Sequence, residues 1–215
     1  MAQNMRIAIV HSLVLLLAGA GLAAPRPHVI LLGRWRAAEA TMESGEKQPF
    51  KVRDLFIDGK DREHTVGSMH EVTDRFFVIR RVLRVNDALQ GESKDPQWIW
   101  RFSAWISVDR QTGRIALVSL PAFDYEASAV SWYRDYAAYC GPSDDGSKSY
   151  MVVAQMGSRK PVLRKEYSGP LCPAPKWDRT PSRVTFLAGG EKNSFVIHAH
   201  SADPQPDSPE EEGPQ

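Results

Sequence analysis

The stretch WIWRFSAWISVDRQTGRIALVSLP, residues 98–121, predicts two antiparallel strands joined by a tight turn. Apolar and polar side chains alternate through its first half, which places Trp98, Trp100 and Phe102 on one face of the first strand. The turn ends at Gly113, and a second apolar run follows until Pro121 interrupts it. This hairpin therefore predicts a protein built from antiparallel sheets.

Similar runs recur along the middle of the chain, most of them next to turns that contain Gly, Pro or Asp. They lie at residues 28–33, 50–57, 77–85, 136–140, 150–154, 184–187 and 195–197. We expect one all-β domain over residues 24–200, an antiparallel sandwich or barrel of about nine to ten strands. A short helix near residues 125–133, with Asp124 as its cap, is the only helix expected.

Two of the predicted turns suggest an alternative fold. Gly113 and Gly146 are 33 residues apart, and each is followed by a run typical of a strand. Their surroundings resemble the inner hairpins of secreted β-propeller blades, a resemblance that implies a small β-propeller-like arrangement. The other turns do not keep this spacing, so the sandwich or barrel is the main prediction.

The two ends of the chain differ from its middle. Arg6 precedes an apolar run over residues 7–22, and small residues continue to Ala23, the pattern of a secretory signal peptide over residues 1–23. The run has 16 residues, short of the roughly 20 that span a bilayer, which favours cleavage over an uncleaved anchor. We expect no membrane span after cleavage. Residues 201–215 contain four prolines and five acids, which predicts a disordered acidic tail.

Export determines how the two cysteines are interpreted. Cys140 and Cys172 are the only cysteines, and both follow the predicted cleavage point. In an oxidising compartment an isolated pair is most simply a disulfide bond. We therefore expect a secreted or periplasmic protein that is stabilised by a Cys140–Cys172 bridge.

Charge and motifs exclude several classes of function. The chain has 27 Lys and Arg against 26 Asp and Glu, a formal charge of +1 that does not favour nucleic-acid binding. It contains no phosphate loop, nucleophile elbow or dinucleotide fingerprint. We expect a non-enzymatic binding or envelope-associated role without a cofactor, in which the partner is an unknown ligand or an envelope component. A subunit that pairs through an open sheet edge is a further possibility.

Aromatic and arginine side chains are the candidate ligand contacts. Trp105 lies on the opposite face of its predicted strand from Trp98 and Trp100, so a ligand, a loop or a partner must cover one of the two faces. Arginines two or four residues apart on a strand share a face and can hold carboxylates or phosphates. The candidate ligand-binding residues are Trp105, Trp132, Tyr133, Arg80 and Arg84.

Histidines supply the alternative function, a metal-assisted hydrolase. His198 and His200 are two residues apart, so on a strand their imidazoles would share a face and could share a Zn²⁺ ion. Further ligands would come from His64 and His70, or from a carboxylate such as Glu63 or Glu71. The candidate metal ligands are therefore His64, His70, His198 and His200.

Overall fold

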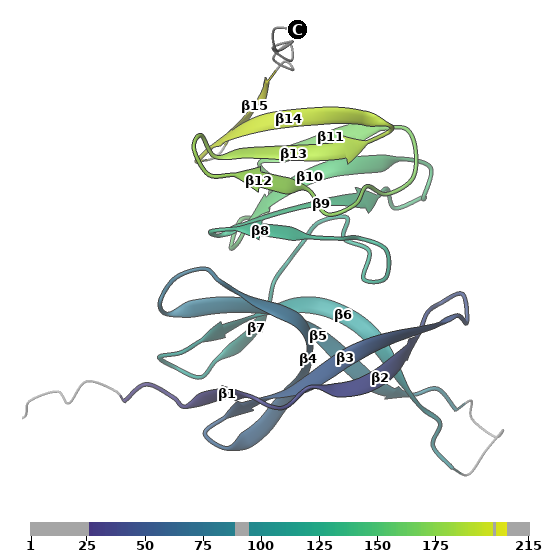
Figure 1. The fold of residues 1–215 in the computed structure, drawn as a ribbon, viewed down its shortest axis with the longest axis vertical. Helices are drawn as coiled ribbons and strands as arrows, with labels where there is room; N and C mark the ends of the chain where they lie inside the picture. The colour runs from purple at the N-terminus through teal and green to yellow at the C-terminus, as the bar shows by residue number, and fades with distance from the viewer. Residues whose placement is uncertain (1–25, 89–94, 200, 206–215) are drawn as a thin grey trace, which may run out of the picture.

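The computed structural model describes residues 26–88, 95–199 and 201–205, and every regular element within them is a β-strand. The all-β prediction is confirmed, but fifteen strands form three sheets, more than the nine or ten expected. Figure 1 shows the sheets stacked as layers along the longest axis of the molecule. This sandwich-like stack differs from propeller blades, which surround a common axis.

The first sheet has seven strands in the order β1-β3-β2-β6-β5-β4, with β7 beside β6. Its strands are β1 (Ile30–Leu32), β2 (Arg36–Thr41), β3 (Lys47–Ile57), β4 (Lys60–Glu71), β5 (Phe76–Asn86), β6 (Trp98–Asp109) and β7 (Ile115–Leu117). Strand β3 also pairs with β4, and β2 meets β6 through one parallel residue pair, Ala40 with Trp100. These pairings link β3, β2, β6, β5 and β4 into a ring, but the β2–β6 link is a single residue pair, so the sheet is strongly curled rather than a fully hydrogen-bonded closed barrel.

Two four-stranded antiparallel sheets follow in sequence, each with its strands in order of sequence. The middle sheet contains β8 (Ser131–Tyr133), β9 (Tyr136–Pro142), β10 (Ser149–Gln155) and β11 (Leu163–Tyr167). The last sheet contains β12 (Lys176–Asp178), β13 (Arg183–Ala188), β14 (Glu191–His198) and β15 (Ser201–Gln205).

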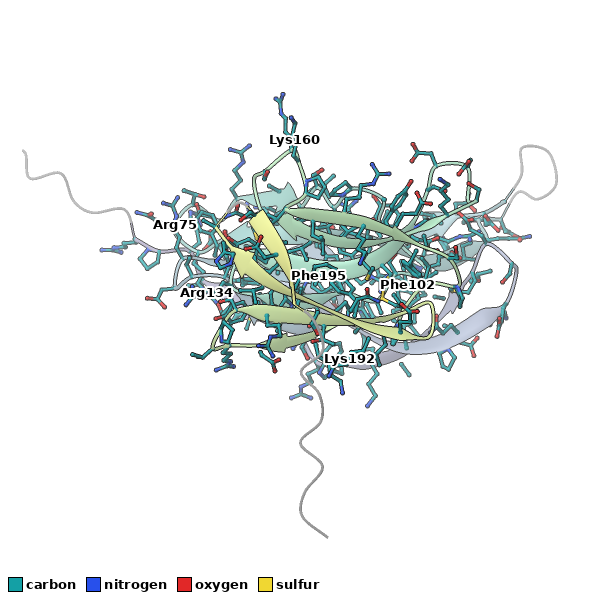
Figure 2. The ribbon with its side chains drawn as sticks, turned by 90° about the horizontal axis from the view of Figure 1, so that it is seen from above. Arg75, Phe102, Arg134, Lys160, Lys192 and Phe195 are labelled. Atoms are coloured by element: carbon teal, nitrogen blue, oxygen red, sulfur yellow. A yellow bond between two sulfur atoms is a disulfide. The ribbon has the colours of Figure 1, made fainter. Side chains whose placement is uncertain are left out.

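The middle sheet is buried on both faces. Ala138, Cys140 and Met151 pack towards the last sheet, in a core that also contains Phe186 and Phe195. In the view from above, Phe195 lies inside the body, whereas Lys160 and Lys192 project from it (Figure 2). The opposite face carries a second core, with Ala137, Tyr139, Val152 and Ala154. A sheet covered on both faces needs continuous apolar strands rather than alternating ones, which is the pattern of β9 and β10.

The predicted disulfide is confirmed. Cys140 of β9 is bonded to Cys172, which precedes β12, with their Cα atoms 5.5 Å apart. Both residues are buried in the core between the middle and last sheets. The bond therefore links the middle sheet to the segment that leads into the last sheet.

Two sequence predictions are corrected at this level. No helix occurs among the described residues. Asp124 does accept hydrogen bonds from the backbone N–H groups of Glu126 and Ala127, as a cap would, but only a single turn follows. Residues 201–205 of the predicted tail form strand β15, which pairs with β14 at the edge of the sheet, where Pro204 can be accommodated. Residues 206–215 and the predicted signal peptide, 1–23, lie outside the described residues.

The additional strands are those whose residues are polar or few. Strand β4 reads KDREHTVGSMHE, and Thr65 is the only fully buried residue among its twelve positions. Strands β8 and β12 have three residues each. The sequence does not predict such strands, because they lack an alternating or continuous apolar pattern. They join their sheets through backbone hydrogen bonds.

Candidate functional site

An aromatic surface lies along β6 of the first sheet. Trp98, Trp100 and Phe102 alternate on this strand, and their side chains share one of its sides. Phe50 of β3 packs edge-on against this row, with ring centroids 6.2 Å from Trp100 and 5.4 Å from Phe102. Trp98, at the start of the strand, is 52% exposed. The row is therefore packed at Phe102 and open at Trp98.

Arg84 of β5 stands beside this aromatic row. It is the register partner of Trp100, and its guanidinium lies 5.5 Å from the centroid of the Trp98 ring. This distance allows a cation–π interaction. Within the described residues no ion pair joins Arg84 to a carboxylate, and its side chain lines the groove between β4 and β5.

A groove of about 350 Å³ adjoins the aromatic row between β4 and β5. We call it the β4–β5 groove, and its lining residues are Asp61, Arg62, Glu63, His64, Val82, Leu83 and Arg84. His64 connects the groove to the aromatic row, because its ring packs edge-on against Trp100 with centroids 5.1 Å apart. The groove therefore combines planar rings with both acidic and basic hydrogen-bonding groups.

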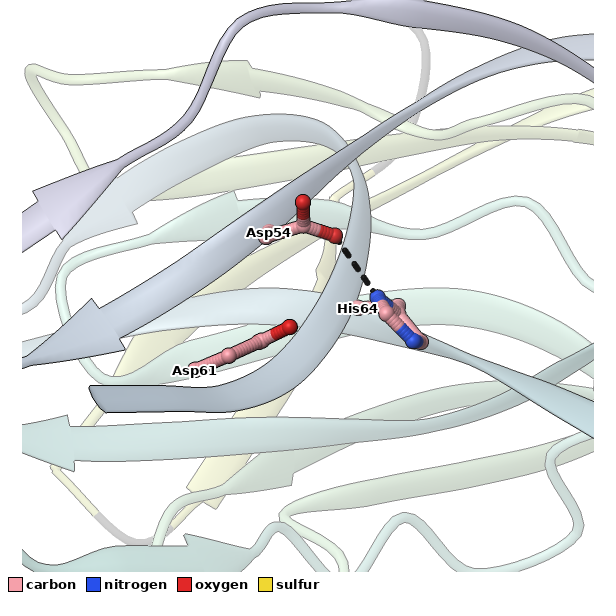
Figure 3. Close-up of side chains that lie close together, drawn as sticks. All are labelled: Asp54, Asp61 and His64. Carbon is pink, nitrogen blue, oxygen red and sulfur yellow. Dashed lines mark hydrogen bonds and ion pairs between the residues drawn. The ribbon is translucent and has the colours of Figure 1, made fainter.

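Asp54, Asp61 and His64 form a compact cluster at the wall of this groove (Figure 3). Asp54 Oδ1 lies 2.7 Å from Nδ1 of His64 and accepts a hydrogen bond from Nη2 of Arg36 at 2.5 Å. One potential ligand atom from each member of the cluster lies within 4.8 Å of the other two. Asp54 and His64 are partly buried, whereas Asp61 is exposed.

A turn and a bulge bring these residues together. Ile57 pairs with Lys60 across the two-residue turn Asp58-Gly59, in which both residues have positive φ, as a type I′ hairpin requires. The register then shifts between Leu55 and Phe56, so that Arg62 has no partner on β3. This shift places His64 rather than Glu63 opposite Asp54.

Arg80 does not share the exposed position of Arg84. Its guanidinium lies 4.7 Å from the ring centroid of Phe102 and donates a hydrogen bond to the backbone carbonyl of Tyr125. Burial lowers the pKa of this side chain, against the opposing attraction of Asp124. Arg80 therefore holds the loop before β8 against the first sheet.

The structure places Trp105 and Trp132 between the first and middle sheets. Trp105 is only 8% exposed, and the two ring centroids are 5.3 Å apart. Val78 and Val118 belong to the same core cluster. Tyr133 packs against Trp177 at 5.3 Å. These candidate ligand contacts are thus in contact with protein, and only Arg84 of the predicted set borders the groove.

The candidate metal ligands are not brought together. His70 lies against the ring of Trp132, and its Nε2 is 2.8 Å from the carbonyl oxygen of Arg134. His198 Nε2 lies 3.2 Å from Asp203 in the last sheet, whereas His64 belongs to the cluster with Asp54 in the first sheet. His200 lies outside the described residues.

Sequence reasoning missed Asp54 and Asp61 as members of a site. A usable signal existed, because the Asp58-Gly59 turn predicts that residues about four positions on either side of it face one another. Without the bulge, that rule would pair Asp54 with Glu63. The bulge places His64 opposite Asp54, and no residue type in the sequence predicts that bulge.

Comparisons with known proteins do not identify the chain: no protein-family model, curated protein or solved structure matches it. Among the described residues, no helix could cross a membrane. The function must therefore be argued from the geometry of the molecule itself.

Proposed function

We propose that this protein is an exported, non-enzymatic binding protein, and that the β4–β5 groove together with Trp98 and Trp100 holds an acidic carbohydrate. The observation that carries the proposal is the half-exposed indole of Trp98, which lies against Arg84, a residue that lines the groove. Large apolar side chains exposed next to a concave polar site are typical of ligand-binding surfaces.

The chemistry of the groove suits a sugar that bears carboxylates. A pyranose ring presents an apolar C–H face to an indole and its hydroxyl groups to the side, where Asp61 and Glu63 can accept hydrogen bonds. Arg84 can pair with a sugar carboxylate in bidentate fashion. Without the leader and the tail, residues 24–200 carry a formal charge of +5, which favours an anionic ligand.

Two other features support export. The buried Cys140–Cys172 disulfide is typical of proteins that fold in an oxidising compartment. The leader pattern over residues 1–23 agrees with this, and an acidic glycan outside the cytosol is accessible to such a protein. We therefore propose the periplasm or the extracellular medium as the place of action.

The experiment is an isothermal calorimetric titration of the purified mature protein with oligogalacturonate at low salt. Trp98→Ala and Arg84→Gln should each weaken binding at least about tenfold, equivalent to about 1.4 kcal/mol. Arg84→Gln should have no effect on binding of a neutral cello-oligosaccharide of equal length, because only the carboxylates need its charge.

The chain offers a matched control. Trp35 is 45% exposed and stacks on Arg53 at 4.1 Å, so it repeats the Trp98–Arg84 arrangement outside the groove. Trp35→Ala should bind like the wild type. Equal losses in Trp35→Ala and Trp98→Ala, or no binding of either oligosaccharide at millimolar concentration, would contradict the proposal. In the second case, an envelope protein becomes the candidate partner.

A further inference from the structure

The cluster of Asp54, Asp61 and His64 brings two carboxylates and an imidazole close together on one hairpin. The carboxylate of Asp61 lies near the carboxylate of Asp54 and the imidazole of His64. One polar atom from each of the three side chains lies within 4.8 Å of the other two. Within the described residues, neither a hydrogen bond nor an ion pair holds the Asp61 carboxylate in this place. The carboxylates of Asp54 and Asp61 are close enough to repel each other, and Arg36 compensates the charge of Asp54 alone.

We propose that Asp54, Asp61 and His64 bind a single Zn²⁺ ion. The three side chains come from β3 and β4 and point towards one another (Figure 3). The metal site shares Asp61 and His64 with the lining of the β4–β5 groove but uses neither Trp98 nor Arg84, and the inference does not rest on the function proposed above.

The donor set selects the type of metal. One imidazole nitrogen and two carboxylate oxygens are ligands that Zn²⁺ accepts, whereas Ca²⁺ and Mg²⁺ favour sites made of oxygen alone. Three protein ligands leave one position of a tetrahedral ion open. The exposed position of Asp61 at the β4–β5 groove allows water to fill that fourth position.

Neighbouring side chains hold two of the ligands. Arg36 donates a hydrogen bond to Asp54, and the ring of Trp100 packs against His64. Such outer contacts fix the orientation of the ligands. Nδ1 of His64 lies 2.7 Å from Asp54 Oδ1, and a Zn²⁺ ion bound at this nitrogen requires the neutral ring with its single N–H proton on Nε2.

The site also has a cost that limits its affinity. The guanidinium of Arg36, 2.5 Å from Asp54 Oδ1, already neutralises that carboxylate and repels an incoming cation. We therefore expect reversible binding of Zn²⁺ rather than the very tight binding of a structural zinc site. Arg36→Gln, which removes the charge, should strengthen binding.

The test is calorimetric titration of the tag-free mature protein with ZnCl₂. The wild type should bind one Zn²⁺ per chain, and Asp61→Asn, which removes a direct ligand, should weaken binding by more than the roughly 10–100-fold typical of losing an outer partner of a ligand. Asp61 is exposed, so this variant should keep the melting temperature of the metal-free wild type. Co²⁺ should give the visible spectrum of a four-coordinate ion in the wild type only.

Asp58→Asn is the matched control. Asp58 is on the same hairpin and pairs with His28 at 2.6 Å, but it has no third ligand within the described part of the chain. It should bind Zn²⁺ like the wild type. Equal affinities in Asp61→Asn and the wild type, equal losses in Asp58→Asn and Asp61→Asn, or no binding at millimolar Zn²⁺ would overturn the proposal. None of these outcomes depends on whether the groove binds a sugar.

Discussion

Reduction of the Cys140–Cys172 bond should lower stability by an amount that follows from the chain it encloses. The two cysteines are 32 residues apart in sequence. A loop of this size restricts the unfolded chain by about 3.7 kcal/mol in the loop-entropy relation. For a chain of this length each kcal/mol shifts the melting temperature by about 2–4 °C, so we expect a fall of about 7–15 °C.

Differential scanning calorimetry with and without a phosphine reductant measures this shift. The control is the double variant Cys140→Ala with Cys172→Ala, which should melt at the same temperature in both buffers because it has no bond to lose. A shift below about 2 °C in the wild type would show that the bond does not restrict the unfolded chain as argued. An equal shift in the double variant would trace the effect to the reductant.

Three further predictions concern packing and charge. Gly141→Ala should destabilise the protein by at least about 3 kcal/mol in urea denaturation, because its Cβ would lie 1.6 Å from the carbonyl oxygen of Ala122. Trp105→Ala should cost about 3–5 kcal/mol in the same assay and leave oligosaccharide affinity unchanged, since the ring is buried between two sheets. The hydrogen bonds from Arg75 hold the pKa of Asp109 well below its usual range. The stability that Asp109 contributes is therefore present above about pH 4 and is lost as the pH falls through this lowered pKa, so Asp109→Asn should flatten the acid limb of a melting series from pH 7 to pH 2.

The hairpins were the part of the fold that the sequence predicted best. The strand over residues 98–109, its turn at Gly113 and the return strand are all present, as β6 and β7. The turn at Asp58-Gly59 also lies where its residue types predict. Such features depend on neighbours in sequence, where the physical rules for turns and alternation apply directly.

The layering of the sheets could not be predicted in the same way. Trp105 was expected on the face opposite Trp98 and Trp100, but what covers it is the middle sheet, whose Trp132 follows 27 positions later. Alternation along one strand shows that a face is apolar and leaves open whether a ligand or another part of the chain covers it. The sequence therefore predicted an apolar face at Trp105 and Trp132, and the structure shows that each of these rings packs against the other.

The cluster around His64 could not be predicted from the sequence for a different physical reason. A bulge adds one residue to one strand of a pair, and Arg62 takes that role without any Gly or Pro to mark it. One position of register decides whether Asp54 faces an acid or an imidazole. The sequence therefore predicted the hairpin that carries the site, and the pairing that makes the site required the structure.

The measurement that tests the proposed binding surface most directly is a titration with oligogalacturonate followed by the indole N–H signals of the six tryptophans in NMR spectra. The signals of Trp98 and Trp100 should shift progressively, while those of Trp35 and of the buried Trp105 stay in place. Shifts confined to Trp35 or Trp105, with Trp98 unchanged at saturation, would show that the ligand binds elsewhere and that the β4–β5 groove is not its site.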